Sequence, residues 1–441
     1  MARELNGWYD SDHLNQVAFP LGGIGAGMVC LDGNGSFSHL SMRHEPDVFN
    51  IPMMFAALHI VSGEGKSMTR VLQGPAQKQR IFGMTGTGNG GRGSALGLPH
   101  FGTARFRDRF PFGTVELEDE GIPVSVRITG FSPFVPLDAD SSSLPVAGLE
   151  YEFVNNRQET ISATFSFNAE NFIKTSGEKN SVRKIHKGLV LQQLAADHAK
   201  DEGYVSIRID DESTAVDPAW FRGGWFDPLT MLWKNLESGA CVDRDEYSDD
   251  SGPSAGGSVY IPLTLEPGEA KTVRVQLAWY VPQSGLRSGE DQKCCCDESA
   301  CCSDGATSTD TQTYEPWYTT RFDGIDDLAD YWRDSYQKLR DESACFTDTF
   351  YSSTLPPEVL EAVAANLTIL KSPTVLRQKD GRLWCWEGCS DDSGCCAGSC
   401  THVWNYEQAT AFLFNDLAKG MREVEFGYAM NESGHMGFRT K

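Results

Sequence analysis

Apolar and polar residues alternate along most of the chain between about residues 15 and 285. The clearest apolar positions are Ile122, Val124, Val126 and Ile128; Ile161, Ala163, Phe165 and Phe167; and Val273, Val275 and Leu277. A period of two places one face of each stretch in a core and the other face outward, as in antiparallel sheet. Turn-forming sequences such as "VNNRQET" and "EPGEAK" separate the stretches. We therefore expect a β-sandwich domain over residues 1–285.

The pattern changes after the last of these stretches. The following residues are mostly Ser, Asp, Thr, Gly and Cys, with too few apolar side chains to form a core, so they predict a loop. Helical spacing then begins, with Leu328, Tyr331, Trp332, Ser335 and Leu339 on one stripe. We assign residues 286–345 to a Cys-, Ser- and Asp-rich loop followed by a linker helix.

Helical patterns continue to the end of the sequence. Pro356 and Pro357 suit a helix start, and the apolar positions that follow are Val359, Val363, Leu367 and Leu370. The stretch from Thr401 predicts a third helix that ends in the 420s. Residues 346–441 are therefore expected to begin an α-helical domain.

Charge limits the classes of partner. The 38 Lys and Arg residues face 61 Asp and Glu residues, which gives a formal net charge of −23. Nucleic acids and anionic membranes bind clustered Lys and Arg, and the sequence has no such run, so neither is expected as a partner. No apolar run approaches the roughly 20 residues that span a bilayer. The first residues lack the layout of a signal peptide, so we expect a cytoplasmic protein unless an export signal lies upstream.

Two motifs near the N-terminus suggest binding sites. In "PLGGIGAGMVCLDGNGS" the spacing of Gly23 and Gly25 begins a dinucleotide fingerprint, but its third position is Met28 and no βαβ unit follows. Close approach of strands and turns explains these glycines better. His39, Arg43, His44 and Asp47 either line a cleft or form a satisfied buried network, and the network is the favoured interpretation.

Most of the thirteen cysteines fall in two clusters, at positions 294, 295, 296, 301 and 302 and at positions 385, 389, 395, 396 and 400. Four cysteines of the second cluster, at positions 389, 395, 396 and 400, together with His402 have enough ligands for zinc, but their spacing lacks the paired C-x2-C pattern of structural zinc sites. Packing, free thiols or disulfides remain alternatives to a zinc clasp. We expect no metal and no cofactor.

Glu387 is the residue with the clearest catalytic potential. In "LWCWEGC" it lies beside Trp384 and Trp386, and a glycine follows it. Sugar rings stack on aromatic faces, and a carboxylate beside them is the usual chemistry of glycosidic cleavage. The alternative is a structural or surface Glu.

The residues also resemble a known family over nearly the whole chain. The stretches "VAFPLGGIGAGMVCLDGNGSFSHLSMRHEPDVFN", "FGTVELEDEGIPVSVRITGFSPFVPLDADSSSLPVAGLEYEF" and "WEGCSDDSGCCAGSCTHVWNYEQA" resemble glycoside hydrolase family 116. This is the family of retaining β-glucosidases that includes the non-lysosomal glucosylceramidases, also called bile-acid β-glucosidases. The resemblance implies a β-sandwich followed by an (α/α)6 barrel, and a β-linked glucoside or glucosylated lipid as substrate.

The resemblance also implies roles for single residues. The family nucleophile matches Glu387. The family's sugar-binding Asp, at the start of the next helix, is best matched by His402. Trp386, Trp404 and Asn405 are further candidates for substrate binding, while Glu407 is a rival carboxylate within that helix.

The barrel is expected to be incomplete in this sequence. Twelve helices of roughly 11 to 12 residues with their loops need well over 200 residues. Residues 354 to 441 number 88, enough for three or four helices. The second carboxyl group, which the family carries on a later helix, is then expected beyond Lys441, and this chain is expected to be feebly active at most.

Two other functions stay open. The same scaffold would serve another sugar, such as xylose or N-acetylglucosamine. A protein of a different class, a non-catalytic carbohydrate-binding protein, would use the β-sandwich as its working part.

Overall fold

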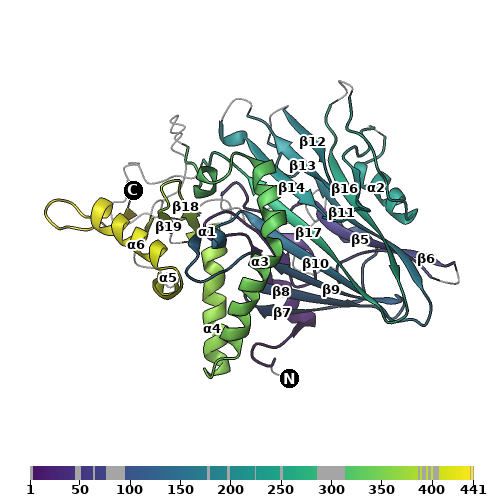
Figure 1. Cartoon of the computed structure of the whole chain (residues 1–441), viewed down its shortest axis with the longest axis horizontal. Coiled ribbons are helices and arrows are strands. Elements are labelled where there is room, and N and C mark those ends of the chain that lie inside the picture. Colours follow the sequence, from purple (N-terminus) through teal and green to yellow (C-terminus); the bar gives the residue numbers. More distant parts are fainter. Residues whose placement is uncertain are drawn as a thin grey trace.

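The computed structural model (Figure 1) describes residues 3–44, 51–62, 65–75, 95–175, 179–195, 199–223, 225–248, 252–285, 313–385, 388–389, 394–395, 399–400, 407–437 and 439–440. Two large antiparallel sheets face each other, so the predicted β-sandwich is confirmed. The (α/α)6 barrel stays a prediction.

The larger sheet has nine strands. In spatial order they are β1 (Tyr9–Asp10), β7 (Thr103–Arg109), β8 (Phe112–Glu118), β9 (Val124–Phe131), β10 (Val146–Asn155), β17 (Ala270–Tyr280), β14 (Gly203–Arg208), β13 (Gly188–Gln193) and β12 (Asn180–Ile185). In the central strand β10, Tyr151 pairs with Ile128 on one side and with Val273 on the other. The alternation predicted from the sequence therefore sets the register of this sheet.

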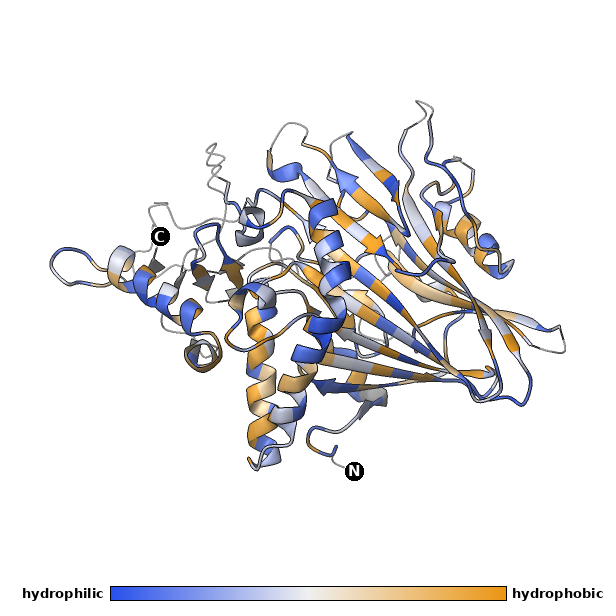
Figure 2. Cartoon of the chain, in the orientation of Figure 1, coloured by the Kyte–Doolittle hydropathy of each residue, from blue (hydrophilic) through white to orange (hydrophobic). Residues whose placement is uncertain are grey.

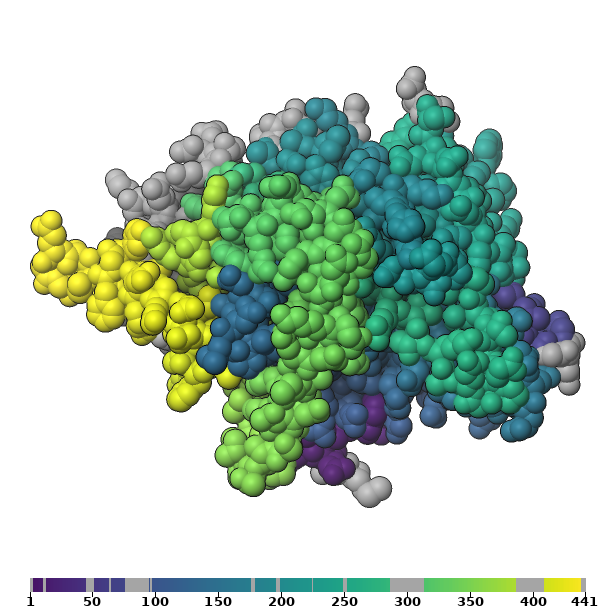
Figure 3. All heavy atoms as spheres, viewed as in Figure 1, coloured from purple at the N-terminus to yellow at the C-terminus, as the bar shows by residue number. Residues whose placement is uncertain are grey.

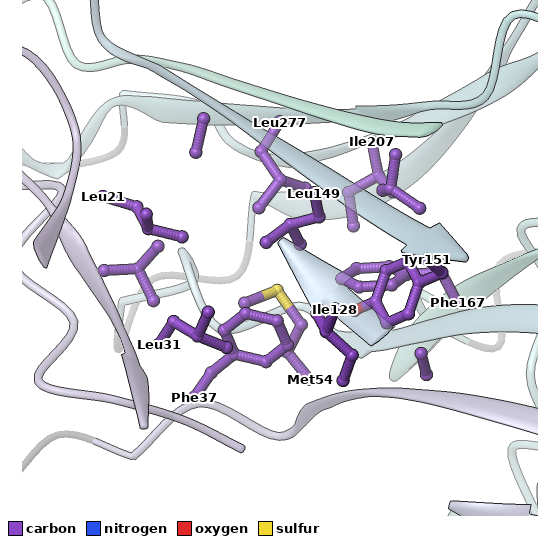
Figure 4. Close-up of a cluster of buried hydrophobic side chains, with 14 of the residues drawn as sticks. Leu21, Leu31, Phe37, Met54, Ile128, Leu149, Tyr151, Phe167, Ile207 and Leu277 are labelled. Carbon is purple, nitrogen blue, oxygen red and sulfur yellow. The ribbon is translucent and has the colours of Figure 1, made fainter. Parts of the chain in front are cut away.

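The smaller sheet has five strands, in the order β15 (Ala215–Asp217), β16 (Gly256–Leu265), β11 (Ile161–Glu170), β5 (Met54–Val61) and β6 (Ser67–Val71). Its inner face packs on that of the larger sheet, and the ring centroids of Tyr151 and Phe165 are 5.0 Å apart. Figure 4 shows this core, where Leu149, Tyr151 and Phe167 meet side chains from several strands. A small sheet of β2 (Ala18–Leu21), β3 (Val29–Asp32) and β4 (Phe37–Ser38) adjoins it.

Helix α3 (Ile325–Tyr351) crosses the outer face of the nine-stranded sheet (Figure 1). Its apolar stripe, with Trp332, faces the sheet, and Figure 2 shows many hydrophilic residues along the rest of the helix. Tyr336 lies on this stripe, whereas the predicted Ser335 is only half-buried. The sheet accommodates Tyr336 at Gly148, where an added Cβ would lie 2.8 Å from the tyrosine ring. Helix α2 (Pro228–Glu237) packs against the smaller sheet.

The described tail consists of short elements. They are α4 (Pro357–Leu367), the 3-10 helix Thr368–Lys371, β18 (Val375–Arg377), β19 (Leu383–Cys385), β20 (Gly388–Cys389), β21 (Gly394–Cys395), β22 (Ser399–Cys400), α5 (Glu407–Leu413), α6 (Asn415–Glu423), the π-helix Val424–Ala429 and β23 (Arg439–Thr440). Figure 3 shows α6 and the π-helix after it, in yellow, projecting from the body of the molecule.

Two predictions for the tail need correction. The single helix expected from Thr401 is interrupted at Phe414, whose non-helical backbone (φ −143°, ψ 69°) and buried ring separate α5 from α6. In α4 the buried side is formed by Leu360, Ala364 and Leu367, so Val359 and Val363 are exposed. The two valines share a helical repeat with Leu367, but the stripe that faces the core is rotated toward Leu360.

Other short elements are the helix α1 (Ala139–Ser142) and the 3-10 helices Ser11–Gln16, Ala95–Gly97, Ala199–Asp201 and Trp317–Thr320. Among the helices that the structure describes, none has the length and apolar character needed to cross a membrane.

Candidate functional site

Glu387 and the four predicted substrate-binding residues, Trp386, His402, Trp404 and Asn405, lie outside the described residues. The structure does describe the chain up to Cys385, two positions before Glu387. The hairpin of β18 and β19, which ends at Cys385, is the described structure that leads to the candidate site.

The hairpin is short and almost fully buried. Val375 pairs with Cys385 and Leu376 pairs with Trp384, and all four side chains are buried. An Asp-Gly turn closes the hairpin, with Gly381 at a φ of 87° that favours glycine. Cys385 is paired with Val375 in the backbone ladder at the end of the hairpin. The position of the chain is therefore fixed two residues before Glu387.

The glycine-rich N-terminal segment packs directly against this hairpin. The carbonyl of Gly25 accepts a hydrogen bond from the backbone nitrogen of Arg377 at 3.1 Å. An added Cβ at residue 25 would lie 2.3 Å from that nitrogen, and the φ of Gly25 is 65°. The prediction that these glycines permit close approach is confirmed at this contact.

Arg377 in β18 joins the hairpin to the loop that carries α1. Its guanidinium donates to Asp140 Oδ1 at 2.8 Å and to the carbonyl of Ala139 at 3.2 Å. It also lies over the ring of Trp317, 3.9 Å from the centroid. Arg377 is buried and its contacts are charge-assisted, so it is a strong anchor for the hairpin.

Lys371 forms a second anchor just before the hairpin. Its side chain is 1% exposed, and Nζ donates to Ser132 Oγ at 2.6 Å and to the Ser132 carbonyl at 3.0 Å. Ser132 Oγ in turn donates to the carbonyl of Gly22 at 2.8 Å. Burial lowers the pKa of Lys371 to about 7. The rings of Phe110 and Phe134 lie 5.4 and 5.8 Å from Nζ and favour its protonated form.

These contacts give the hairpin a fixed place on the sandwich. Catalytic groups work best when the elements that carry them are held by packing and hydrogen bonds from outside the site. Gly25, Arg377 and Lys371 provide such support for the segment that leads into Glu387. Figure 1 shows β18 and β19 beside α1, as the contact with Asp140 requires.

Local sequence pattern does not indicate the two basic anchors. Lys371 and Arg377 fall in "LKSPTVLRQKD", where charged residues are usually exposed. Only the cluster of glycines at 22–27 indicated a close contact, and it did not identify the partner.

The predicted buried network is found only in part: His44 is buried, His39 and Arg43 are half-buried, and each contacts a different partner, with His39 Nδ1 2.6 Å from Ser38 Oγ. His44 Nε2 lies 3.0 Å from the hydroxyl of Tyr318, and burial lowers the pKa of His44 to about 3. Arg43 donates to the carbonyls of Lys200 and Glu202 at 3.0 and 3.1 Å. Asp47, the fourth member of the motif, lies outside the described residues.

The zinc hypothesis rests on side chains that the structure does not describe. Among the described residues there is no group of three or more His, Cys, Asp or Glu side chains that would hold a metal ion. Cys241 and Cys345, outside the clusters, are free thiols.

Comparison with protein families gives one match. The model described as beta-glucosidase 2, glycosyl-hydrolase family 116 N-terminal, matches residues 18–339. The match covers the sandwich and half of α3. No curated protein matches the sequence.

Three solved structures show a distant likeness. A protein named as a kojibiose phosphorylase from the human microbiome is 9% identical with a TM-score of 0.39, over 82% of this chain and 40% of that one. A bacterial glucoamylase in complex with acarbose is 9% identical with a TM-score of 0.43, over 100% of this chain and 52% of that one. A polysaccharide lyase is 10% identical with a TM-score of 0.25, over 62% and 33%. The chain spans about half or less of the length of these proteins.

Proposed function

Because the chain belongs to glycoside hydrolase family 116, as the match over residues 18–339 shows, we propose that it is part of a retaining β-glucosidase with Glu387 as the nucleophile. The family match and the position of Glu387 between Trp386 and Gly388 carry the proposal. In the proposed reaction Glu387 attacks the anomeric carbon and forms a glycosyl-enzyme. A second carboxylic acid, whose carboxyl group lies about 5 to 5.5 Å from that of the nucleophile, protonates the leaving oxygen and then activates water.

The anchored hairpin supports this role for Glu387. A nucleophile has to meet the anomeric carbon in a narrow range of positions, and small displacements cost much of the rate. Cys385 is buried and paired, and the hairpin before Glu387 is held by Gly25 and Arg377. A surface carboxylate would not need this support.

The exposed surface of the helical tail is relevant to where the second carboxyl group lies. Large apolar side chains are exposed on it, namely Val359, Val363, Phe412, Phe426 and Tyr428. Exposed apolar side chains of this kind fit a helical barrel of which these are the first helices. From the family resemblance we propose that the acid/base belongs to a later barrel helix and that His402, Trp404 and Asn405 contact the sugar.

A pair of substrates tests the assignment on this chain. Hydrolysis of 2,4-dinitrophenyl β-glucoside needs little help from an acid because the leaving group is already a weak base, whereas phenyl β-glucoside depends on protonation. We expect slow hydrolysis of the first by residues 1–441, background rates on the second, and loss of the first in Glu387→Gln.

Glu407→Gln is the matched control, because it removes the rival carboxylate at the start of α5. Its activity is expected to equal that of the unchanged chain. Loss of hydrolysis in Glu407→Gln with activity kept in Glu387→Gln would reverse the assignment. Hydrolysis of phenyl β-glucoside at an ordinary enzymatic rate would contradict the expectation that the acid/base carboxyl group is not among residues 1–441.

The choice of sugar is tested with the same leaving group. Dinitrophenyl β-xyloside and N-acetyl-β-glucosaminide are the rivals to the glucoside, and the largest kcat/KM identifies the sugar. We propose the glucoside, with a glucosylated lipid as one natural form. If all three are inert while the protein binds sugars, the non-catalytic carbohydrate-binding function replaces the enzymatic one.

A further inference from the structure

The loop that carries α1, residues 134–142, contacts the chain on both sides of the segment that holds the candidate site. Before that segment, Asp140 accepts a hydrogen bond from Arg377 in β18 at 2.8 Å. After it, the backbone nitrogen of Leu137 donates to the carbonyl of Leu413, the last residue of α5, at 2.7 Å. Figure 1 shows α1 next to both β18 and α5. Between Arg377 and Leu413 lie all the candidate site residues, namely Trp386, Glu387, His402, Trp404 and Asn405.

A pair of buried rings adds to the contact with α5. Phe134 in the loop and Phe414, which follows α5, are both buried, and their ring centroids lie 5.1 Å apart at an interplanar angle of 86°. Edge-to-face rings at this distance attract each other in addition to the burial of their surface. The end of α5 is therefore held by the loop through a ring and through the backbone.

Leu137 has a backbone conformation that its side chain disfavours. Its φ is 69°, in the left-handed region where a residue with a Cβ is strained. Its side chain is 72% exposed, so burial of the leucine does not explain the conformation. In this conformation its N–H donates to Leu413. Strained residues that the surrounding structure holds in place are typical of functional sites.

The loop is also fixed to itself and to the glycine-rich segment. Ser142 Oγ accepts from the backbone nitrogen of Val135 at 2.8 Å and donates to its carbonyl at 3.2 Å. The carbonyl of Ser142 accepts from the nitrogen of Ile24 at 2.7 Å. The next residue, Gly25, accepts from the nitrogen of Arg377. The loop, the glycine-rich segment and the hairpin of β18 and β19 are thus joined in a closed set of contacts.

We propose that loop 134–142 is a positioning element of the active site, with Asp140 and Leu137 as its positioning residues. The loop holds the chain before and after the candidate-site segment, so that the carboxyl group of Glu387 meets the anomeric carbon of a sugar held near the start of α5. This role rests on the function proposed for Glu387. It makes the sandwich a part of the catalytic unit.

The rate of covalent labelling tests the role of Asp140. The reagent is a 2-fluoro β-glucoside with a dinitrophenyl leaving group, added to the 441-residue chain, and mass spectrometry follows the labelled fraction. The half-saturating concentration reports sugar binding, whereas the limiting rate constant reports attack by Glu387. Asp140→Ala should lower the limiting rate constant by between about tenfold and a hundredfold, and change the half-saturating concentration by less than about threefold.

Asp330→Ala is the matched control. Asp330 in α3 pairs with Arg208 in β14 at 2.7 Å, and its side chain is 53% exposed, against 55% for Asp140. The two substitutions should lower the urea midpoint by similar amounts. Only Asp140→Ala should lower the limiting rate constant, because the contact of Asp330 lies at the junction of the sheet with α3.

Two substitutions of Leu137 keep the test valid if Asp140→Ala folds poorly. Leu137→Pro removes the N–H that donates to Leu413 and cannot adopt a φ of 69°. Leu137→Asn removes the same exposed side chain, keeps the N–H and tolerates the left-handed region. We expect the proline variant to lose at least about tenfold in limiting rate constant and to exchange amide hydrogens faster at 407–413. The asparagine variant should match the unchanged chain in both.

Three results would overturn the proposal. If Glu387 is labelled at the same rate in the unchanged chain, in Asp140→Ala and in Leu137→Pro, the function proposed for Glu387 stands and only the role of the loop fails. An equal loss of rate in Asp330→Ala would trace the effect to general stability. If the unchanged chain takes no label at Glu387, the proposed function fails and the role of the loop fails with it.

Discussion

Helices α3 and α4 follow one another along the chain, and both carry apolar residues at helical spacing, yet their surroundings differ. The stripe of α3 is covered by the nine-stranded sheet, where Trp332, Tyr336 and Leu339 are buried. In α4 only one side is covered, and Val359 and Val363 face outward. An apolar stripe thus predicts a helix. It does not predict whether another part of this chain covers the stripe.

The same contrast separates the sandwich with α3 from the tail that follows α4. The sandwich with α3 buries most of its large apolar side chains and pairs charges across the sheet–helix contact, although Trp225 is 96% exposed. The tail places the candidate nucleophile after an anchored hairpin but leaves Phe412 and Phe426 exposed. We infer that the stability of the chain depends more on the first region than on the second.

The largest effect is expected from a cavity beneath α3. Trp332 is 1% exposed, so Trp332→Ala should lower the free energy of unfolding by about 3 to 5 kcal/mol. Val359 in α4 is 41% exposed, and Val359→Ala should change it by less than about 0.5 kcal/mol. Urea unfolding followed by circular dichroism measures both. Equal losses would remove the distinction between the two helices.

A buried ion pair should matter more than an exposed one on the same helix. Glu150 in β10 accepts two hydrogen bonds from Arg340 in α3, at 2.6 and 2.7 Å. Because the site is only partly solvated, Glu150→Gln should cost about 2 kcal/mol of unfolding free energy.

The matched control for the ion pair is Glu342, whose partner Lys338 lies 3.9 Å away on the outer side of α3. Glu342→Gln should cost at most about 0.5 kcal/mol. A similar cost for both substitutions would mean that the Glu150 contact adds no stability of its own to the sheet–helix junction.

The junction between the two regions should respond to pH through Lys371. The native pKa of about 7 lies below the usual value of 10.5, so as pH rises the native state loses the proton before the unfolded state does. Stability should therefore rise with pH above 7, by about 1 kcal/mol between pH 7 and 8, relative to Lys371→Met. Urea midpoints at the two pH values, with Lys419→Met on the exposed side of α6 as control, measure the difference. A constant difference between Lys371→Met and the unchanged chain would contradict it.

The smallest effect is expected in the tail. Phe412 is 84% exposed, so Phe412→Ser should leave the free energy of unfolding within about 0.5 kcal/mol. It should lower the fluorescence of the dye ANS, which binds exposed apolar surface. A large loss of stability would show that the Phe412 ring packs against another part of the chain in solution.

The period of the apolar residues was enough to predict the strands and the inner face of the sandwich, because both faces of that core come from the same 285 residues. It was also enough for α3. It failed at Phe414, where a buried aromatic ring within a continuous helical pattern marks a break between two helices. The period also failed to predict which side of α4 is buried. Leu360 and Val359 are both apolar, and only tertiary packing determines that Leu360 is the buried one.

For the candidate site, the sequence supplied Glu387 through residue type and family resemblance. Its support was not predictable, because it comes from residues far apart in the sequence. Arg377 meets Asp140 across more than two hundred residues, and Lys371 meets Ser132 across a similar span. Local pattern cannot express such pairings, and only the glycines at 22–27 indicated where two backbones come close.

The most direct test of the account is covalent labelling by a 2-fluoro β-glucoside with a dinitrophenyl leaving group. The fluorine slows breakdown of the glycosyl-enzyme, and the leaving group departs without an acid. The account predicts one added fluoroglucosyl group per chain, on the peptide containing Glu387, and no labelling of Glu387→Gln. Labelling of Glu407 or Asp391, or the same labelling in Glu387→Gln, would contradict it.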